Sequence, residues 1–313
     1  MIHGFGTDPA PPPESIEDLL GPRLLAAMEG LEITSKKVLA GKLHGERRSR
    51  RRGFSIDFAD YRPYVAGDDL RYVDWNVYAR LDALFLKLYL DEEDLSVLLL
   101  LDATPSMDWG APAKWNFARR VAMAIGSISL ASRHRLSVAT WDSHGVNHLR
   151  DLRGRSRTAE LGRWLLGREI AGADGGETFE SGVRMLAPTR RGRGVVVILS
   201  DFLGEGDPLP AMRLLGGGGD DLHCLQILSP QELDPGACGL AGDLRLEDAE
   251  DGSTREVTVT PALLRAYRAK LDARVALVRD AARRSGGAHL AIPSDSDVES
   301  LLLDELRRGG LLR

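Results

Sequence analysis

The sequence predicts an α/β protein with a doubly wound, mostly parallel sheet, preceded by an N-terminal helical and β-hairpin extension. Two apolar runs carry this prediction: LSVLLLLD at residues 95–102 and GVVVILSD at residues 194–201. Neither run alternates between apolar and polar residues, which is typical of strands that are covered on both faces. Helical patterns lie between such strands along the chain, and this alternation favours parallel pairing.

Residues 1–94 are predicted to form the extension. Residues 9–13 are rich in proline and are predicted to be a disordered lead-in, and a helical pattern follows behind the capping residue Ser15. The basic stretch GERRSRRRGF comes next and is predicted to be a linker. Residues 54–64 and 84–91 combine aromatic and branched side chains, so we expect a pair of strands there.

Residues 95–292 are predicted to form the main α/β domain, and residues 293–313 a C-terminal helix packed on it. The expected helices are NFARRVAMAIGSISLASR, RTAELGRWLLG, FESGVRMLA, PLPAMRLLG and PALLRAYRAKLDARVALVRDAARRSG. The expected strands after the first are RLSVATWD, VNHLRD, GVVVILSD, DLHCLQILS and AHLAI. A DG turn inside DLRLEDAEDGSTREVTV predicts a hairpin insertion near residues 243–260.

Composition narrows the classes of function. The chain has 313 residues and a net charge of −5, and this mildly acidic balance gives no reason to expect nucleic acid as a partner. It has only two cysteines, which do not indicate a disulfide framework. No signal-peptide pattern is visible, and no apolar run approaches the roughly 20 residues of a membrane span. We therefore expect a cytoplasmic protein without direct membrane insertion.

Oxygen-bearing side chains follow the two apolar strands at the point where each strand ends. Asp102, Thr104 and Ser106 occupy alternate positions after the first strand, and Asp201 follows the second. Alternate residues of an extended segment point to the same side, and open parallel sheets bind ligands at the carboxyl ends of their strands. Thr178 offers a further hydroxyl, and it follows two glycines and precedes a helical pattern. Two close carboxylates repel each other, and a bound cation removes that repulsion. Hard oxygen ligands favour Mg²⁺, or else Mn²⁺ or Ca²⁺, over zinc.

The order of these five residues resembles the metal-ion-dependent adhesion site of von Willebrand factor A domains, with Thr104 where serine is usual. Upstream, the chain reads DYRPYVAGDDLRYVDWNVYARLDALFLKLYLDEED. This stretch resembles the bacterial domain-of-unknown-function family number fifty-eight, in which an A-type domain follows just such a series. The resemblance runs in order over roughly residues 45–300.

The resemblance implies a function as well as a fold. Such proteins are usually encoded beside AAA+ ATPases of the MoxR type and are thought to work with them as adaptors or chaperone components. The resemblance also implies that Thr104, Ser106 and Thr178 bind the metal directly, and that Asp102 and Asp201 bind it largely through water. A carboxylate from a partner protein would then fill the vacant position.

Several polar residues have simpler explanations. Asp102 or Asp201 alone could cap the turn that follows its strand, and only the combination favours a metal site. The basic run at residues 47–52 is interpreted as a solvated linker or a patch for an acidic protein partner. His144 and His148 have the spacing of a helical metal pair, but they lie in a predicted hairpin. Six charged residues are predicted to form a structural network that fixes the N-terminal segment to the main domain: Arg62, Asp68, Asp69, Arg71, Asp74 and Arg80.

Two classes of function remain open at this point. The first is a protein-binding module that depends on a metal and has no chemistry of its own. The second is a metal-dependent phosphohydrolase that uses Asp102, since haloacid dehalogenases also place an aspartate at the end of an apolar strand. Those enzymes have Asp-x-Asp, however, whereas Thr104 stands at the second position here, so general acid–base help is missing. No Walker A, HExxH or GxSxG sequence is present, and binding is therefore the preferred interpretation.

Overall fold

A computed structural model describes residues 11–35, 37, 58–89, 95–170, 179–190, 192–204, 206–248 and 252–313. The chain divides into a main unit, residues 1–43 and 95–313, and a small unit, residues 44–94. The sequence predicted that residues 1–94 form one extension. They belong instead to two different units. The basic run at residues 47–52 lies outside the described residues.

The main unit is built around a six-stranded sheet in the order β10-β7-β6-β3-β4-β5. All neighbouring strands are parallel except β4 and β5, which form an antiparallel hairpin. The predicted doubly wound, mostly parallel sheet is thereby confirmed. The strands are β3 (Ser96–Asp102), β4 (Arg135–Asp142), β5 (Gly145–Leu152), β6 (Gly194–Ser200), β7 (Asp221–Leu228) and β10 (Ala288–Pro293).

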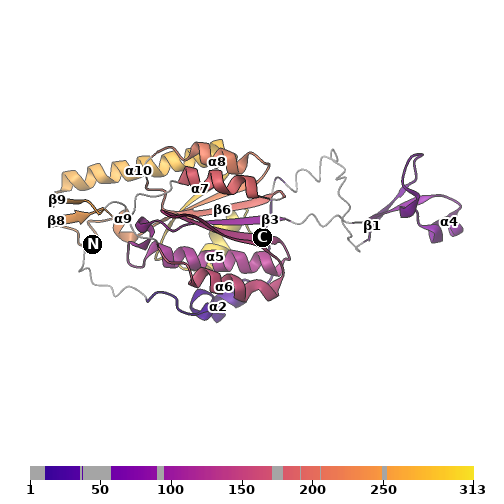
Figure 1. Cartoon of the computed structure of the whole chain (residues 1–313), viewed down its shortest axis with the longest axis horizontal. Helices are drawn as coiled ribbons and strands as arrows, with labels where there is room; N and C mark the ends of the chain where they lie inside the picture. Colours follow the sequence, from indigo (N-terminus) through magenta and orange to yellow (C-terminus); the bar gives the residue numbers. More distant parts are fainter. Residues whose placement is uncertain are drawn as a thin grey trace. The chain divides into compact units, whose positions relative to one another are not determined.

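Helices cover both faces of this sheet (Figure 1). Alternate residues of β3 show why: Val97, Leu99 and Leu101 enter one apolar core, and Leu98 and Leu100 enter another. On the face of the first core lie α5 (Lys114–Ala131) and α6 (Thr158–Leu166), and on the face of the second lie α7 (Phe179–Leu186), α8 (Leu209–Gly216) and α10 (Pro261–Arg284). A strand buried on both faces has no polar side, which explains the unbroken apolar runs.

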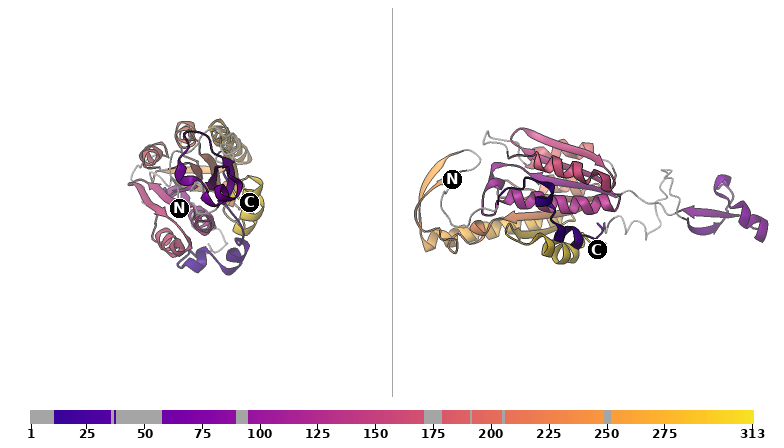
Figure 2. Two further views of the ribbon diagram at one scale, coloured as in Figure 1. Left: turned by 90° about the vertical axis from the view of Figure 1, so that its right-hand side faces the viewer. Right: turned by 90° about the horizontal axis from the view of Figure 1, so that it is seen from below.

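Short elements connect these helices and strands. The 3₁₀ turns of this unit are η2 (Pro105–Asp108), η3 (Arg155–Arg157) and η4 (Ala187–Thr189), and a short helix α9 (Pro230–Leu233) follows β7. The predicted hairpin insertion is present as β8 (Gly242–Glu247) and β9 (Thr254–Val259), which pair antiparallel. This hairpin lies beside the first turn of α10 (Figures 1 and 2).

The N-terminal and C-terminal segments pack together on the first core. Ser15 begins α1 (Ile16–Leu19) with a capping box, α2 (Pro22–Ala27) follows, and Leu19 is completely buried. At the other end of the sequence, α11 (Val298–Ser300) and the π-helical turn η5 (Leu301–Leu306) bury their apolar side chains in the same core. An isolated bridge joins Ile33 to Leu312. The helical pattern behind Ser15 thus belongs to the main unit because its apolar face needs this core.

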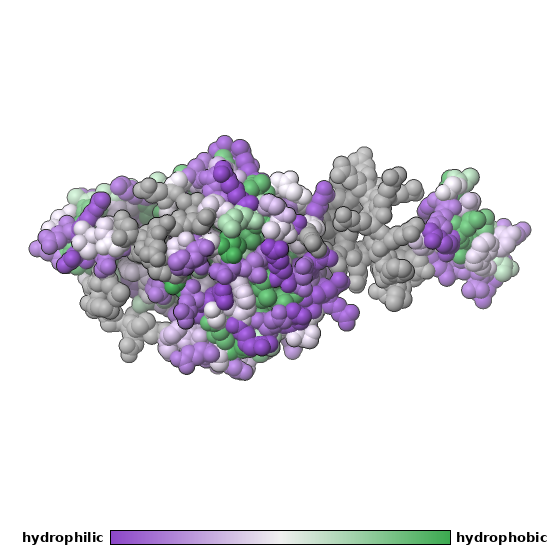
Figure 3. Space-filling view, viewed as in Figure 1, coloured by the Kyte–Doolittle hydropathy of each residue, from purple (hydrophilic) through white to green (hydrophobic). Residues whose placement is uncertain are grey.

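The small unit is a two-stranded antiparallel sheet with a helical connection. It consists of β1 (Phe58–Pro63), the 3₁₀ turn η1 (Leu70–Tyr72), α4 (Trp75–Leu81) and β2 (Phe85–Tyr89). The predicted strand pair is confirmed. The unit leaves large apolar side chains exposed among charged ones (Figure 3), namely Val65, Leu70, Tyr72, Trp75, Tyr78 and Leu81. In the part of the chain that the structure describes, no helix has both the length and the apolar character of a membrane span.

Candidate functional site

The candidate site lies where the winding of the sheet reverses. From the central strand β3 the chain first adds β4 and β5 on one side and then crosses to add β6, β7 and β10 on the other. Connections leave the carboxyl ends of β3 and β6 in opposite directions, and such a switch point is the usual place for a ligand. Asp102 ends β3, and Asp201 follows directly after β6.

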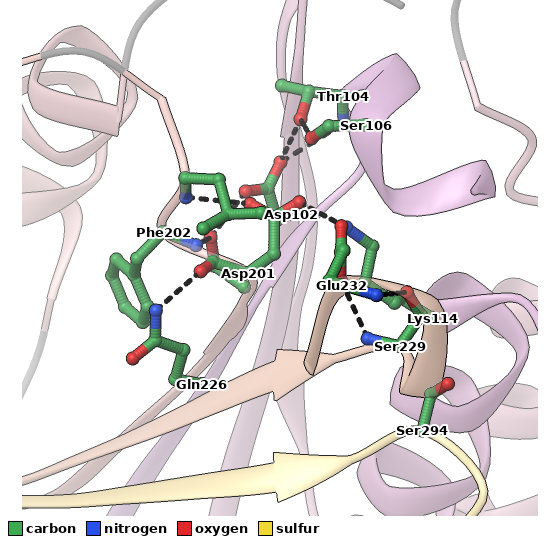
Figure 4. A network of polar contacts seen from close by, with 12 residues as sticks. Asp102, Thr104, Ser106, Lys114, Asp201, Phe202, Gln226, Ser229, Glu232 and Ser294 are labelled. Atoms are coloured by element: carbon green, nitrogen blue, oxygen red, sulfur yellow. Dashed lines mark hydrogen bonds and ion pairs between the residues drawn. The ribbon is translucent and has the colours of Figure 1, made fainter. Parts of the chain in front are cut away.

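Asp102, Thr104 and Ser106 converge as the sequence predicted (Figure 4). One carboxylate oxygen of Asp102, Oδ1, accepts hydrogen bonds from the backbone N–H of Thr104 at 3.1 Å and from its Oγ1 at 2.7 Å. The Oγ1 of Thr104 is 3.2 Å from the Oγ of Ser106. Thr104 precedes η2 and its proline, which takes the chain out of the sheet and keeps these oxygens on one side.

A serine that the sequence analysis missed holds the second oxygen of Asp102. Ser200, the last residue of β6, donates to Asp102 Oδ2 at 2.5 Å and accepts from the backbone N–H of Phe202 at 2.9 Å. Asp102 is only 5% exposed. Burial, together with the nearby charge of Asp201, raises the pKa of Asp102 to about 7, against the opposing effect of the Ser200 and Thr104 hydrogen bonds. Near pH 7 the protonated and ionised forms of this carboxyl are therefore both populated.

Asp201 is held by a lysine that the sequence analysis also missed. The Nζ of Lys114, the first residue of α5, lies 2.6 Å from Asp201 Oδ2 and 2.5 Å from Glu232 Oε1. Glu232 in α9 in turn accepts the backbone N–H of Ser229 at 2.7 Å. The other oxygen of Asp201 accepts from the backbone N–H of Leu203 at 3.0 Å. The carboxylate of Asp201 thus faces Lys114 rather than the hydroxyls of Thr104 and Ser106.

The ammonium of Lys114 stays charged although its side chain is completely buried. Burial alone would lower its pKa, but Asp201 and Glu232 together raise the pKa above its ordinary value. Burial raises the pKa of Glu232, although Lys114 pulls in the other direction. With Asp102 ionised, three carboxylates stand against the ammonium of Lys114 and the guanidinium of Arg274, which also interacts with Asp201, so the site carries a surplus of one negative charge. A bound cation would offset that surplus.

The spacing of the oxygens fits a small divalent cation. Ligands at about 2.0–2.1 Å from Mg²⁺ in an octahedron lie about 2.9 Å apart along each edge. The hydroxyls of Thr104 and Ser106, two of the direct ligands that the resemblance implies, lie 3.2 Å apart, which is close to this value. These two hydroxyls would hold the metal on one side, with the carboxylate of Asp102 behind them. Thr178, the other predicted direct ligand, lies outside the described residues.

Both missed groups had some signal in the sequence. Lys114 lies two residues before the predicted helix NFARRVAMAIGSISLASR, and at the start of a helix its charge is unfavourable toward the helix dipole. Ser200 stands next to Asp201 at the end of an apolar strand. Its contact with Asp102 depends on the parallel register, in which Leu101 lies beside Leu199. Register between distant strands cannot be read from a single sequence.

Two ion pairs of the predicted charge network lie within the described residues of the small unit. Arg62 pairs with Asp68 at 2.7 Å, and Arg71 pairs with Asp69 at 2.5 Å. Within residues 58–89, the side chain of Arg80 has no hydrogen bond or ion pair, and its part in the network stays a prediction. The predicted role of the network in fixing this segment to the main domain stays a prediction.

Asp74 has a clear structural role within the small unit. Its carboxylate caps α4 by accepting from the backbone N–H groups of Asn76 and Val77. Lys87 at 3.0 Å and the hydroxyl of Tyr61 at 2.8 Å lower the pKa of Asp74 to about 2. Helix capping therefore explains Asp74, whereas Trp75 is exposed and contacts the ring of Tyr78 edge to face.

Comparison with known proteins places this chain in a family. "Uncharacterized protein Rv1480" of Mycobacterium tuberculosis is 28% identical over 91% of this chain and 90% of its own length. Among solved structures, BatB from Bacteroides thetaiotaomicron covers 68% of this chain and 98% of its own, with 11% identity and a TM-score of 0.43. The SpRpn10 VWA domain covers 69% and 97%, with 12% identity and a TM-score of 0.39. Likenesses of this size do not identify a function. The family described as "Protein of unknown function DUF58" matches residues 60–276, more than half of the chain, and the chain belongs to this family.

Proposed function

We propose that this protein is a non-enzymatic protein-binding module whose main unit captures a carboxylate of a partner protein through a divalent cation, Mg²⁺ in the first place. The observation that carries the proposal is the contiguous set of oxygens on Asp102, Thr104 and Ser106 at the switch point of the sheet. When bound, the cation would supply an open coordination position for a carboxylate oxygen.

Burial divides the site into an inner and an outer part. The carboxylates of Asp102 and Asp201 are buried, whereas Thr104 and Ser106 are partly exposed. An incoming acidic side chain would therefore meet the hydroxyl side of the site first. The fixed carboxylates lie behind and balance the charge of the cation.

The surroundings of Asp102 support binding over catalysis. A nucleophilic carboxylate needs an oxygen that is open to its substrate. Both oxygens of Asp102 already accept hydrogen bonds, from Thr104 and from Ser200, and the residue is almost completely buried. Thr104 offers no acid at the position where a phosphohydrolase of the haloacid dehalogenase type would need one.

We propose an AAA+ ATPase of the MoxR type as the partner, with this protein as its adaptor or co-chaperone. The support for this step is the sequence resemblance alone. A module that presents a metal to an acidic side chain suits an assembly that must form and come apart. Each charge-assisted contact contributes on the order of 1.5–3 kcal/mol, which is enough to hold a complex of modest affinity.

The test is capture of the MoxR-type ATPase of the same organism by the immobilised full chain, in Mg²⁺ and in EDTA. We expect recovery in Mg²⁺, loss in EDTA, and loss in Mg²⁺ when Ser106→Ala removes one hydroxyl. Ser132→Ala is the matched control, because Ser132 lies at the far end of α5 and α5 begins beside the site. Equal recovery in both buffers would refute the role of the metal.

A second measurement separates the metal from the partner. Calorimetric titration of the chain with MgCl₂ should give a binding isotherm that Ser106→Ala weakens and Ser132→Ala leaves unchanged. Hydrolysis of a generic phosphomonoester by the Mg²⁺-loaded protein, abolished by Asp102→Asn, would contradict the non-enzymatic proposal.

A further inference from the structure

A cavity of about 200 Å³ lies at the amino-terminal ends of β3 and β4, whereas the proposed metal site lies at the carboxyl ends of β3 and β6. Its polar lining comes from the first residues of β3 and β4 and from the second half of β5, with one residue after η4. The residues that matter for its chemistry are Ser96, Arg135, Ser137, His148, Arg150 and Arg190. The proposed function uses none of them.

The cavity exists because the covering helix is shorter than the strands below it. The helix α7 has 8 residues, about 12 Å, whereas β4 has 8 residues and spans about 26 Å. Phe179 at the start of α7 packs on Trp141 near the end of β4, with 5.4 Å between ring centroids. Leu186, the last residue of α7, already lines the cavity. The helix α7 therefore does not cover the first residues of the strands.

A β-bulge directs polar side chains to this place. The register of β4 and β5 shifts between Leu136 and Val138, so that Ser137 faces the bulge. On the bulged strand Asp151 has a φ of 55°, a left-handed conformation that is uncommon for residues other than glycine. Bulges commonly re-aim side chains next to functional sites. Here the two residues of β5 on either side of the distortion are Arg150 and Asp151, and both line the cavity.

Two of the six buried side-chain polar atoms that lack a hydrogen-bond partner in the described part of the chain belong to residues of this cavity. The Nδ1 of His148 accepts from the Nε of Arg150 at 2.8 Å, which leaves the hydrogen of the neutral ring on Nε2. That Nε2 is buried and makes no hydrogen bond. The Nη1 of Arg190 pairs with Asp220 at 2.5 Å, but its buried Nη2 makes no hydrogen bond either.

The donor groups around the cavity suit an oxyanion. Among the described residues, the guanidinium groups of Arg150 and Arg190 lie with the carboxylates of Asp151 and Asp220 at this place. Burial, together with the charge of Arg150, lowers the pKa of His148 to about 4, so its ring is neutral near pH 7. A neutral imidazole still donates from Nε2, and an arginine fork matches the geometry of an oxyanion.

We propose that this cavity binds a small oxyanion of the phosphate class, either as the free ion or as the phosphoryl group of a small metabolite. Donors reach it from β3, β4, β5 and the residue after η4, and a tetrahedral anion accepts hydrogen bonds from several directions, whereas a planar carboxylate accepts them near one plane. The volume of about 200 Å³ is below the 300–1,000 Å³ typical of pockets for drug-sized ligands. It suits one charged group. Buried donors that remain unpaired destabilise a fold, and an anion would satisfy both of them.

Thermal unfolding in EDTA tests the site without any contribution from a divalent cation. Sodium phosphate should raise the unfolding temperature relative to sodium chloride of equal ionic strength, and sodium acetate should not. Glycerol phosphate provides the second arm: stabilisation by both phosphates indicates a site that is open to a metabolite, and stabilisation by inorganic phosphate alone indicates the free ion. Acetate as effective as phosphate would overturn the assignment to the phosphate class.

Variants of His148 locate the effect. His148→Phe fills the same space without a donor and should weaken phosphate binding, measured by calorimetry, on the order of tenfold to a hundredfold. Because it also removes an unpaired buried donor, it should leave the unfolding temperature in chloride unchanged or raise it. His148→Gln, whose amide nitrogen can take the place of Nε2, should retain much of the binding.

Two further controls keep the inference distinct from the proposed metal site. Ser137→Ala, at the bulge, should also weaken phosphate binding, and it serves if His148→Phe does not fold. Ser106→Ala, at the metal site, should leave phosphate binding unchanged. An absence of any phosphate effect would mean that water alone fills the cavity. Phosphate binding that is unaltered in both His148→Phe and Ser137→Ala would place the anion elsewhere, and either result overturns the proposal.

Discussion

Lys114 couples three segments that are far apart in the sequence. Its ammonium, at the start of α5, joins the aspartate that follows β6 to a glutamate of α9. An isolated charge cannot be buried without a large cost in free energy, but a charge with two hydrogen-bonded partners can be. The pairing fixes Asp201 beside Asp102 and leaves the hydroxyl side of the site open to solvent. Lys114, which is not part of the adhesion-site pattern, thus determines the position of Asp201 in that pattern.

Removing this ammonium should destabilise the main unit. Lys114→Met leaves Asp201 and Glu232 buried without a counter-charge, and breaking a buried ion pair in this way costs about 3–5 kcal/mol of unfolding free energy. Urea denaturation followed by circular dichroism measures this loss. Lys270→Met, at an exposed position of α10, is the matched control and should change the unfolding free energy by less than about 1 kcal/mol. Equal stability of the two variants would show that the buried contacts contribute little.

Asp102 makes stability depend on pH with a defined sign. Its folded pKa, about 7, lies above the ordinary value of 3.8, so the folded state binds more protons than the unfolded state between these values. In the absence of metal, the contribution of this carboxyl is most favourable below about pH 4, decreases as pH rises through 7, and then levels off. Because a cation competes with that proton, Mg²⁺ should raise the unfolding temperature more at pH 8 than at pH 5. A stabilisation by Mg²⁺ that is the same at both pH values would contradict this linkage.

At the scale of elements, the start of the sheet depends on close backbone approach. Gly194 begins β6 beside Ser96, the first residue of β3. A Cβ at Gly194 would lie 2.1 Å from the backbone oxygen of Ser96 and 2.7 Å from its nitrogen, far inside any tolerated contact. Backbone atoms cannot rotate away as side chains can, so the two strands would have to separate at this end.

Gly194→Ala should therefore lower the unfolding free energy by about 1–3 kcal/mol, the usual range for overpacking. Gly204→Ala is the matched control, because a Cβ there has no neighbour within 4 Å. Both variants gain the same methyl group, but only the methyl group of Gly194→Ala collides with backbone atoms. Chemical denaturation of the two proteins side by side measures the difference. Equal stability would mean that β3 and β6 can adjust at this edge without cost.

The elements themselves could largely be predicted, since each follows from local pattern. An apolar run such as that of β3 favours a buried strand, and the residues after it could be recognised as a group because they are neighbours in the chain. Contacts that depend on register or on distant segments could not be predicted, as Ser200 and Lys114 show. The place of α1 and α2 is a similar case, because a helical pattern does not reveal which surface it covers.

At the scale of the whole molecule, the described segments differ in what supports them. The main unit has two apolar cores on the two faces of one sheet. Among its described residues, the small unit has one antiparallel strand pair, a 3₁₀ turn and one short helix, and a two-stranded sheet by itself is only marginally stable. The main unit also joins the early and late parts of the sequence, because Glu32 and Arg313 exchange backbone hydrogen bonds and pair through their side chains.

This junction should stabilise the main unit through its leucines rather than through its ion pair. Leu312 is 2% exposed and bridges to Ile33, whereas the side chains of Arg313 and Glu32 are 68% and 48% exposed. Leu312→Ala should cost about 2–5 kcal/mol of unfolding free energy, as buried leucine truncations do. Arg313→Ala should cost less than about 1 kcal/mol, because exposed ion pairs are screened by water and salt. Denaturation by urea ranks the two variants, and limited proteolysis shows whether the segment carrying α1 and α2 has been released. If Arg313→Ala proved the more damaging of the two, the junction would depend on charge and the apolar contact would be secondary.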